Sequence, residues 1–362
     1  MHQSRTYSRG RVVGVAALVA LLLLLAGCSN TPSEPETRTR LVLGTTVTIR
    51  IYEGAKDRAF ERAFDRVEQI EARMSTSTAD YSSTELLEVN RAAGEKPVRV
   101  SEDTFYVVQR ALEYSRMTDG AFDVSIGPLV DLWGIGTEYA GVPEQEEIER
   151  LLEKVDYTSV ELDPDNQTIY LPVEGMGLDV GGIAKGYAAE EVARILREEG
   201  IEHALLDFGG NILAMGHKPD GSKWKIGIQN PQEQRGEFLG VVEDDAMTVV
   251  TSGDYERYFE KDGTRYHHII DARTGYPART GLSSVTIVSE DSTEADALST
   301  AVYVMGVERG SKLIESLDGI EAAFVTKEKG VYMTSGMPSR FDVTNEAFET
   351  VSLRTAVEER PN

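Results

Sequence analysis

The chain has 362 residues, of which 37 are Lys or Arg and 61 are Asp or Glu, so its formal net charge is −24. This balance lacks the basic footprint of a nucleic-acid-binding protein, and we expect no nucleic-acid partner. The 41% hydrophobic content is typical of a globular protein with one elaborated domain or two intimate ones. The single cysteine excludes an intramolecular disulfide and a cysteine-based zinc site.

The N-terminus has the pattern of an export signal. Arg5, Arg9 and Arg11 precede an uncharged run from Val12 to Ala26, which is shorter than the span of about 20 apolar residues that crosses a membrane. The run leads to Cys28, and the ending Leu-Ala-Gly-Cys resembles the lipobox of bacterial lipoproteins. The alternatives are an uncleaved anchor and an ordinary signal followed by an accidental cysteine.

From this pattern we predict four parts of the chain. Residues 1–27 would be a lipoprotein signal peptide, and residues 28–40, rich in Ser, Thr, Pro and Glu, a flexible tether after a lipidated Cys28. Residues 41–345 would form the globular domain and residues 346–362 a loose tail. The protein is expected to be exported and held by its lipid to the membrane on the extracytoplasmic, periplasmic side.

Hydrophobic periodicity predicts the elements of the globular part. Alternating side chains predict a strand over 47–52, and helical spacing predicts an amphipathic helix over 56–74. Further helices are predicted at 101–118, 143–155, 183–199, 294–305 and 308–317, and further strands near 160 and 169 and at 204–206, 224–228, 239–242, 247–250, 266–270, 285–288, 321–325 and 331–334. Because strands and helices interleave without a βαβ repeat, we expect an α+β fold with mostly antiparallel sheets and packed helices.

Three glycine-rich segments would let a ligand approach the backbone closely. Residues 120–130 contain Asp123, which could accept hydrogen bonds from a sugar or a ring. Residues 178–187 place Asp179 and two glycines before a helix N-terminus, whose free N–H groups attract anions such as phosphate. Residues 207–211 follow an apolar strand. The alternatives are, in turn, a helix stop before an edge strand, a simple turn and a β-bulge.

Two adjacent histidines lie in a predicted strand. Their side chains would point to opposite faces, so at most one of them acts in a given site. His268 is expected on the same face as Tyr266 and Ile270. The alternative is a strand-end histidine tied to Asp271 in the following turn.

The predicted helix at 294–305 carries Asp296 and Thr300 four residues apart, on one face. Such a pair is usually solvated, but the neighbouring Ala297, Leu298 and Ala301 are too apolar for an outer surface. A buried carboxylate needs a partner. A hard cation such as Mg²⁺, which takes one or two protein oxygens together with phosphate, would provide one.

In their order along the chain these segments resemble the ApbE family of flavin transferases, the FAD:protein FMN transferases, some of which are lipoproteins. The resemblance covers roughly residues 41–334. Its motifs, as they stand here, are Leu43–Thr45, Met74–Thr76, Gly120–Asp123, Asp179–Tyr187, Asp207–Asn211, Ser252–Tyr255, His268–Asp271, Thr274–Gly275 and Ala295–Thr300.

The resemblance implies an activity and partners. Such enzymes bind FAD with Mg²⁺ on its pyrophosphate and transfer FMN to a Thr or Ser hydroxyl of an acceptor protein, with release of AMP. Family acceptors are redox subunits such as those of sodium-pumping NADH:quinone oxidoreductase (Nqr) or Rnf-type complexes. The alternatives are an FAD pyrophosphatase that gives FMN and AMP, a non-catalytic periplasmic flavin-binding lipoprotein, and a structural lipoprotein.

The resemblance also implies roles for individual residues. His268 is the candidate for assisting deprotonation of the incoming hydroxyl. The metal would be held by Asp296, Thr300 and a backbone carbonyl near Gly182, with Ser299 nearby. FAD would contact Leu43, Ser77, Ala121, Phe122, Asp123, Asp179, Lys185 and Ile270.

Two positions depart from the pattern of relatives. Ser77 stands where relatives often have a tyrosine against the flavin ring, and Tyr81 in the following loop is a candidate to replace it. Lys185 stands where some relatives have an acid, and it would bring a positive charge near the phosphates.

Overall fold

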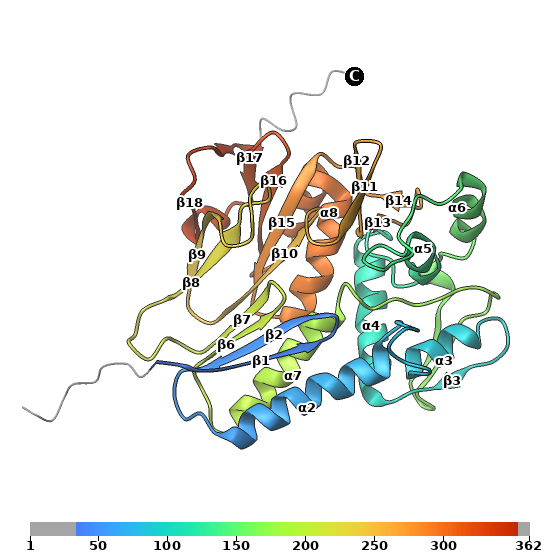
Figure 1. The fold of residues 1–362 in the computed structure, drawn as a ribbon, viewed down its shortest axis with the longest axis horizontal. Coiled ribbons are helices and arrows are strands. Elements are labelled where there is room, and N and C mark those ends of the chain that lie inside the picture. The colour runs from blue at the N-terminus through green and yellow to red at the C-terminus, as the bar shows by residue number, and fades with distance from the viewer. Residues whose placement is uncertain (1–33, 354–362) are drawn as a thin grey trace, which may run out of the picture. The chain divides into compact units, whose positions relative to one another are not determined.

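A nine-stranded sheet runs through the computed structural model, which describes residues 34–353 (Figure 1). All neighbouring strands in it are antiparallel except β17 and β19, which are parallel. In sheet order the strands are β1 (Glu36–Val42), β2 (Thr45–Ile51), β6 (Ala204–Phe208), β7 (Asn211–Met215), β10 (Met247–Gly253), β15 (Leu282–Ser289), β16 (Glu321–Thr326), β17 (Gly330–Met333) and β19 (Glu349–Val351).

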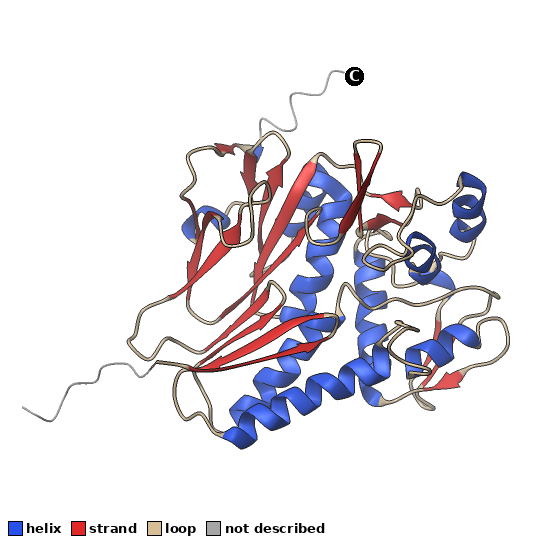
Figure 2. Cartoon of the chain, viewed as in Figure 1, coloured by secondary structure: helices blue, strands red, loops and turns tan. Residues whose placement is uncertain are grey.

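Long helices cover one face of this sheet (Figure 2). Helix α8 packs on β10 and β15, and α7 packs against both α2 and α8. The helices are α2 (Asp57–Met74), α3 (Glu85–Arg91), α4 (Glu102–Met117), α5 (Gly127–Trp133), α6 (Gln145–Leu152), α7 (Ala184–Glu198) and α8 (Ser292–Ile314), with 3₁₀ turns at Tyr157–Ser159 and Met337–Ser339. Within residues 34–353 none of these helices combines the length and apolarity needed to cross a membrane.

Small sheets complete the predicted α+β architecture, which is confirmed. One contains β18 (Phe341–Val343), β9 (Phe238–Asp244) and β8 (Trp224–Gln229), and another contains β3 (Val98–Arg99), β5 (Thr168–Tyr170) and β4 (Glu161–Asp163). Two hairpins pair β11 (Tyr258–Lys261) with β12 (Thr264–His267) and β13 (Ile270–Asp271) with β14 (Tyr276–Pro277).

The two strongest periodic patterns form as predicted. In β2 the alternating residues Val47, Ile49 and Ile51 are buried. Helix α2 buries the apolar stripe that includes Phe60 and Phe64. Both elements therefore present their apolar side to one core, as burial of nonpolar surface requires.

Three boundaries differ from those predicted. The tether ends earlier, because 36–42 pairs along its whole length with β2, and the predicted tail includes β19 at 349–351. The strand predicted over 266–270 is broken at His268, where β12 ends and β13 has not begun. The two helices predicted on either side of residue 306 are confirmed: α8 is interrupted by a kink at Gly306, whose φ of 75° and ψ of 178° are not helical.

The region of β1 has a physical reason for being ordered despite its polar composition. The guanidinium groups of Arg38 and Arg40 lie 4.4 and 4.7 Å from the ring centroids of Phe60 and Phe64 in α2. Such cation–π contacts, together with pairing to β2, hold a strand whose own side chains are mostly exposed. The prediction of the signal peptide and of lipid on Cys28 concerns residues outside 34–353.

Helices α7 and α8 approach closely at Gly186. A methyl group added there would lie 2.1 Å from the carbonyl oxygen of Ser292 and 2.8 Å from Cα of Thr293. The backbone N–H of Gly186 donates to Oδ2 of Asp296 at 2.9 Å. Only glycine permits this distance between the two backbones.

Gly186→Ala is therefore expected to lower the free energy of unfolding by about 1–3 kcal/mol, the cost of overpacking a close contact. The matched control is Gly141→Ala, where the nearest atom to an added methyl is the Tyr139 carbonyl oxygen at 3.8 Å; its change should stay within about 0.5 kcal/mol. Urea unfolding of both variants measures the difference. Equal stability of the two variants would contradict this account of the helix contact.

Candidate functional site

A cavity of about 560 Å³, called here the first cavity, gathers residues from distant parts of the sequence. The β1–β2 turn, the loop after α2, the α4–α5 loop, the start of α7, the β12–β13 junction and the first half of α8 all contribute to its wall. Twelve of the predicted site residues line it, namely Leu43, Ser77, Ala121, Phe122, Asp123, Asp179, Gly182, Lys185, His268, Ile270, Asp296 and Thr300.

Ser299 is the predicted site residue that lies behind this wall. It is fully buried, and its hydroxyl is 2.8 Å from the hydroxyl of Ser252 and donates to the backbone oxygen of Asp296 at 2.8 Å. These contacts fix Ser299 between β10 and α8. The structure therefore places it as a support for Asp296.

Asp296 is the most deeply placed acid of the cavity wall, with 3% of the residue exposed. One carboxylate oxygen accepts the hydrogen bond from the Gly186 N–H, and the other lies 3.6 Å from Nζ of Lys185. Thr300 follows one helical turn later. The alternative of a solvated face does not hold for Asp296, because its carboxylate is buried.

Gly182 lies directly against Thr300. A methyl group added to Gly182 would be 3.2 Å from Oγ1 of Thr300 and 3.0 Å from the ring of Phe122. The preceding Asp179 accepts a hydrogen bond from the Gly181 N–H at 2.8 Å, which shapes the turn into α7. The Gly-Gly pair is thus a turn, as one interpretation predicted, and it is also part of the cavity wall.

The oxygens of this corner fit a magnesium ion. Residues 34–353 contain no group of three or more His, Cys, Asp or Glu arranged to hold a metal. Mg²⁺ needs fewer, because it binds one or two carboxylates and completes its shell with water and phosphate oxygens. Asp296 supplies a carboxylate and Thr300 a hydroxyl close to the Gly182 backbone, and these are hard oxygen donors.

Three cations lie around one acid at the edge of the cavity. The surrounding protein raises the pKa of the Glu256 carboxyl, and the charges of Arg235, Arg257 and Lys185 oppose that shift. All four residues line the first cavity. Arg235 and Arg257 were not predicted from the sequence, where a lone arginine in a loop shows no pattern. Together they form an electropositive patch in a chain with a net charge of −24.

His268 is half-buried beside this patch. Its pKa is well below its usual value because the surrounding protein disfavours the charged ring, and Arg257 and Lys185 add repulsion. Nδ1 lies 3.3 Å from the backbone oxygen of Arg257, so a proton on Nδ1 leaves Nε2 as an acceptor. The carboxylate of Asp271 pairs instead with Arg273 at 3.0 Å, and the predicted alternative of a His268–Asp271 pair is wrong.

Asp123 lies at the opposite wall, in the loop before α5. Burial raises the pKa of its carboxyl, although the N–H and hydroxyl of Ser125 donate to Oδ1 at 2.8 and 2.6 Å. The segment continues into α5 at Gly127 and forms no edge strand. Asp123 therefore caps its own loop and also presents an acceptor to the cavity.

An apolar region lies next to Asp123. It includes Trp133, which was not predicted from the sequence. The indole of Trp133 stacks on Tyr266, with ring centroids 5.6 Å apart. Ile270 packs in the same cluster. Ser77 lines the cavity and donates to Asp80 at 2.7 Å, whereas Tyr81 is not among the lining residues. The suggestion that Tyr81 replaces the missing tyrosine is therefore not supported.

Comparison with known proteins identifies the protein family that shares this sequence. The sequence profile of the ApbE family matches residues 43–324. A FAD:protein FMN transferase of Klebsiella pneumoniae is 35% identical over 312 residues, covering 86% of this chain and 95% of that protein. One of Treponema pallidum is 35% identical over 352 residues, covering 92% and 96%.

Solved structures agree. The ApbE protein of Thermotoga maritima superposes with a TM-score of 0.78 at 32% identity, over 85% of this chain and 99% of that one. The flavin transferase ApbE of Vibrio cholerae superposes with a TM-score of 0.75 at 30% identity, over 84% and 99%.

Proposed function

The chain belongs to the ApbE family, and from this premise we propose that it transfers FMN from FAD to a Thr or Ser hydroxyl of an acceptor protein and releases AMP. The observation that carries the proposal is the convergence, on one cavity, of the Asp296–Thr300 oxygens, the cation patch and a neutral histidine. Each of these three features corresponds to one requirement of phosphoryl transfer: metal binding, charge neutralisation and proton removal.

The cavity has separate regions for the flavin ring and for the pyrophosphate of FAD. The apolar region with Trp133 and Ile270, beside the acceptor Asp123, suits a flavin ring that carries hydrogen-bonding edges. Lys185, Arg235 and Arg257 suit the pyrophosphate, which carries negative charge.

Magnesium would be held by Asp296, Thr300 and the backbone at Gly182, and when bound it withdraws electron density from the pyrophosphate and stabilises charge on the leaving AMP. Nζ of Lys185 lies 3.6 Å from the same carboxylate, which places a positive charge next to these ligands. The hydrogen bond from Gly186 holds Asp296 in place.

The acceptor oxygen forms a bond to the FMN phosphorus while the bond from that phosphorus to the bridging oxygen breaks. The electron pair of that bond leaves with AMP. The hydroxyl proton passes to Nε2 of His268, which is unprotonated at neutral pH because its pKa is lowered. Water in place of the acceptor hydroxyl would give FMN and AMP, which is the pyrophosphatase alternative.

One assay separates the possible functions. The protein is incubated with FAD and Mg²⁺, with and without the flavin-acceptor domain of an Nqr- or Rnf-type redox subunit. We expect covalent FMN on the acceptor and stoichiometric AMP, detected by mass spectrometry, and loss of both with EDTA or with Asp296→Asn. AMP and free FMN alone would indicate a pyrophosphatase, and unchanged FAD a binding protein; either result would contradict the proposal.

His268→Asn is expected to slow transfer by about 10²-fold or more, the usual contribution of a general base, while FAD affinity stays unchanged. Because the pKa of His268 is lowered, the base remains deprotonated as pH falls, so the rate of the unaltered protein should be flat from about pH 8 to about pH 6.5. The matched control is His217→Asn, at a ring whose side chain is 67% exposed. Full transfer by His268→Asn would refute the role of this residue.

We also propose that the protein works outside the cytoplasmic membrane, attached through lipid on Cys28, because residues 12–28 combine an apolar run with the lipobox-like ending. In cells fed radiolabelled palmitate the unaltered protein should be labelled and recovered with membranes. Cys28→Ser should be unlabelled. Equal labelling of the unaltered protein and the Cys28→Ser variant would show that Cys28 is not the site of lipid attachment.

A further inference from the structure

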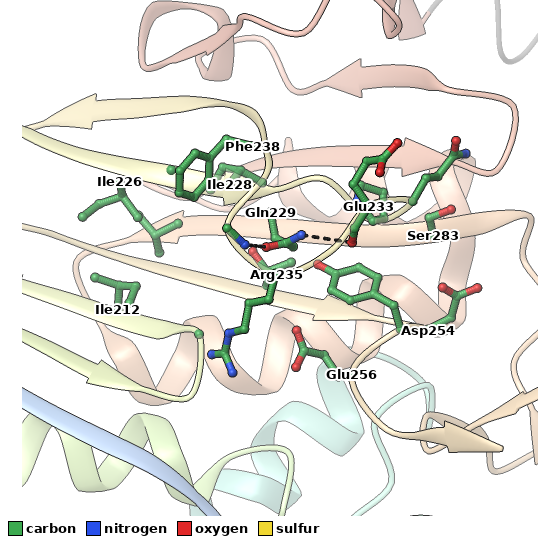
Figure 3. A pocket seen from close by; sticks show the side chains of 18 of the residues that line it. Ile212, Ile226, Ile228, Gln229, Glu233, Arg235, Phe238, Asp254, Glu256 and Ser283 are labelled. Atoms are coloured by element: carbon green, nitrogen blue, oxygen red, sulfur yellow. Dashed lines mark hydrogen bonds between the residues drawn. The ribbon is translucent and has the colours of Figure 1, made fainter. Parts of the chain in front are cut away.

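A second cavity, of about 930 Å³, adjoins the first (Figure 3). Arg235, Thr251 and Glu256 line both cavities. We propose that the second cavity receives the acceptor polypeptide as an extended segment, which adds to the free edge of β8 and brings its hydroxyl to the junction of the two cavities. This inference rests on the proposed function, because it concerns where the second substrate binds.

Two short segments run from one cavity into the other. At the end of β10, Ser252 and Gly253 line the first cavity, and the following Asp254 and Tyr255 line the second. In the β6–β7 turn, Gly209 and Asn211 line the first cavity, and Asp207 and Gly210 line the second. A chain lying in the second cavity therefore passes directly beside the cation patch, where the pyrophosphate is proposed to lie.

Strand β8 offers a backbone edge to such a chain. It is the last strand of the three-stranded sheet, and among the residues that the structure describes only β9 pairs with it, on one side. The consecutive residues 226–229 line the second cavity, so the backbone itself forms part of the wall. An unpaired strand edge is a template for another extended segment, and main-chain hydrogen bonds to it are independent of the acceptor's side chains.

Exposed aromatic side chains also line the second cavity. Phe238, on β9, is 53% exposed and covers Gly227 of β8, and Tyr258 is 43% exposed. Both line the second cavity (Figure 3 shows Phe238). Large aromatic residues that remain accessible beside a cavity are typical anchors of protein interfaces. Together with the strand edge of β8, these accessible aromatic side chains favour a polypeptide as the occupant.

The buried carboxylate of Asp254, in the second cavity, forms ion pairs within the protein. Asp254 lies 3.5 Å from Arg265 and 3.4 Å from Lys327. The charges that face the first cavity, on Arg235 and Glu256, are at the junction. The interior therefore suits a segment with small, mostly uncharged side chains around its hydroxyl residue.

The test uses Phe238→Glu and Tyr258→Glu, two exposed positions where substitution leaves the core intact. The probe is the same Nqr- or Rnf-type acceptor domain. We expect KM for the acceptor to rise at least about tenfold in each variant, while kcat at saturating acceptor and FAD affinity stay unchanged. The matched control is Tyr139→Glu, at a tyrosine that is 82% exposed and lines neither cavity.

Hydrogen–deuterium exchange gives a second measurement. Binding of the acceptor domain should slow amide exchange in β8 and leave unchanged that of β1, the edge strand of the large sheet. Unchanged acceptor KM in both variants, or unchanged exchange in β8, would overturn the docking site while transfer by the unaltered protein still stands. A change of oligomeric state with unchanged KM would assign this face to a second copy of the chain and would also overturn it. Absence of transfer by the unaltered protein overturns the proposed function and the docking site together.

Discussion

The close approach of α7 to α8 at Gly186 is the constraint on which the rest of the site depends. Because no side chain separates the two backbones there, the Gly186 N–H reaches the carboxylate of Asp296, and the start of α7 lies against the same helix as Thr300. Lys185 and Gly182 are then carried to this corner by their position in the chain. A displacement of one helix by the thickness of a methyl group would separate the proposed metal ligands from the cations beside them.

The site also explains how a protein with a net negative charge can attract an anionic substrate. Without residues 1–27, which contain three arginines and no acid, the chain would be more acidic still. A net negative field repels phosphate, so the attraction has to be local. It comes from Lys185, Arg235 and Arg257, which surround Glu256. Arg257 and Lys185 also disfavour a protonated His268. Burial is the main reason why the pKa of His268 is lowered, and two of the three cations proposed to attract phosphate lower it further.

How far the sequence predicts this protein depends on how local each signal is. Helix α2 and strand β2 follow from periodic burial within a few turns or residues, and the motifs around Asp179 and Asp296 are contiguous. Strand β1 could not be found this way, because it is stabilised by pairing with β2 and by stacking on the aromatic rings of α2. Arg235 and Arg257 could not be predicted as site residues, because they reach the cavity only when separate loops come together in the folded chain.

The three residues common to both cavities have a consequence for the order of events. If FAD and the acceptor bind as proposed, a rearrangement of Arg235 or Glu256 on binding one ligand would alter the cavity wall that the other contacts, and the two binding equilibria would be thermodynamically linked. Linkage is reciprocal: the factor by which FAD changes the affinity for the acceptor equals the factor by which the acceptor changes the affinity for FAD. A transferase built on such a shared wall can favour the ternary complex over exposure of FAD to water, without a lid that closes over the nucleotide.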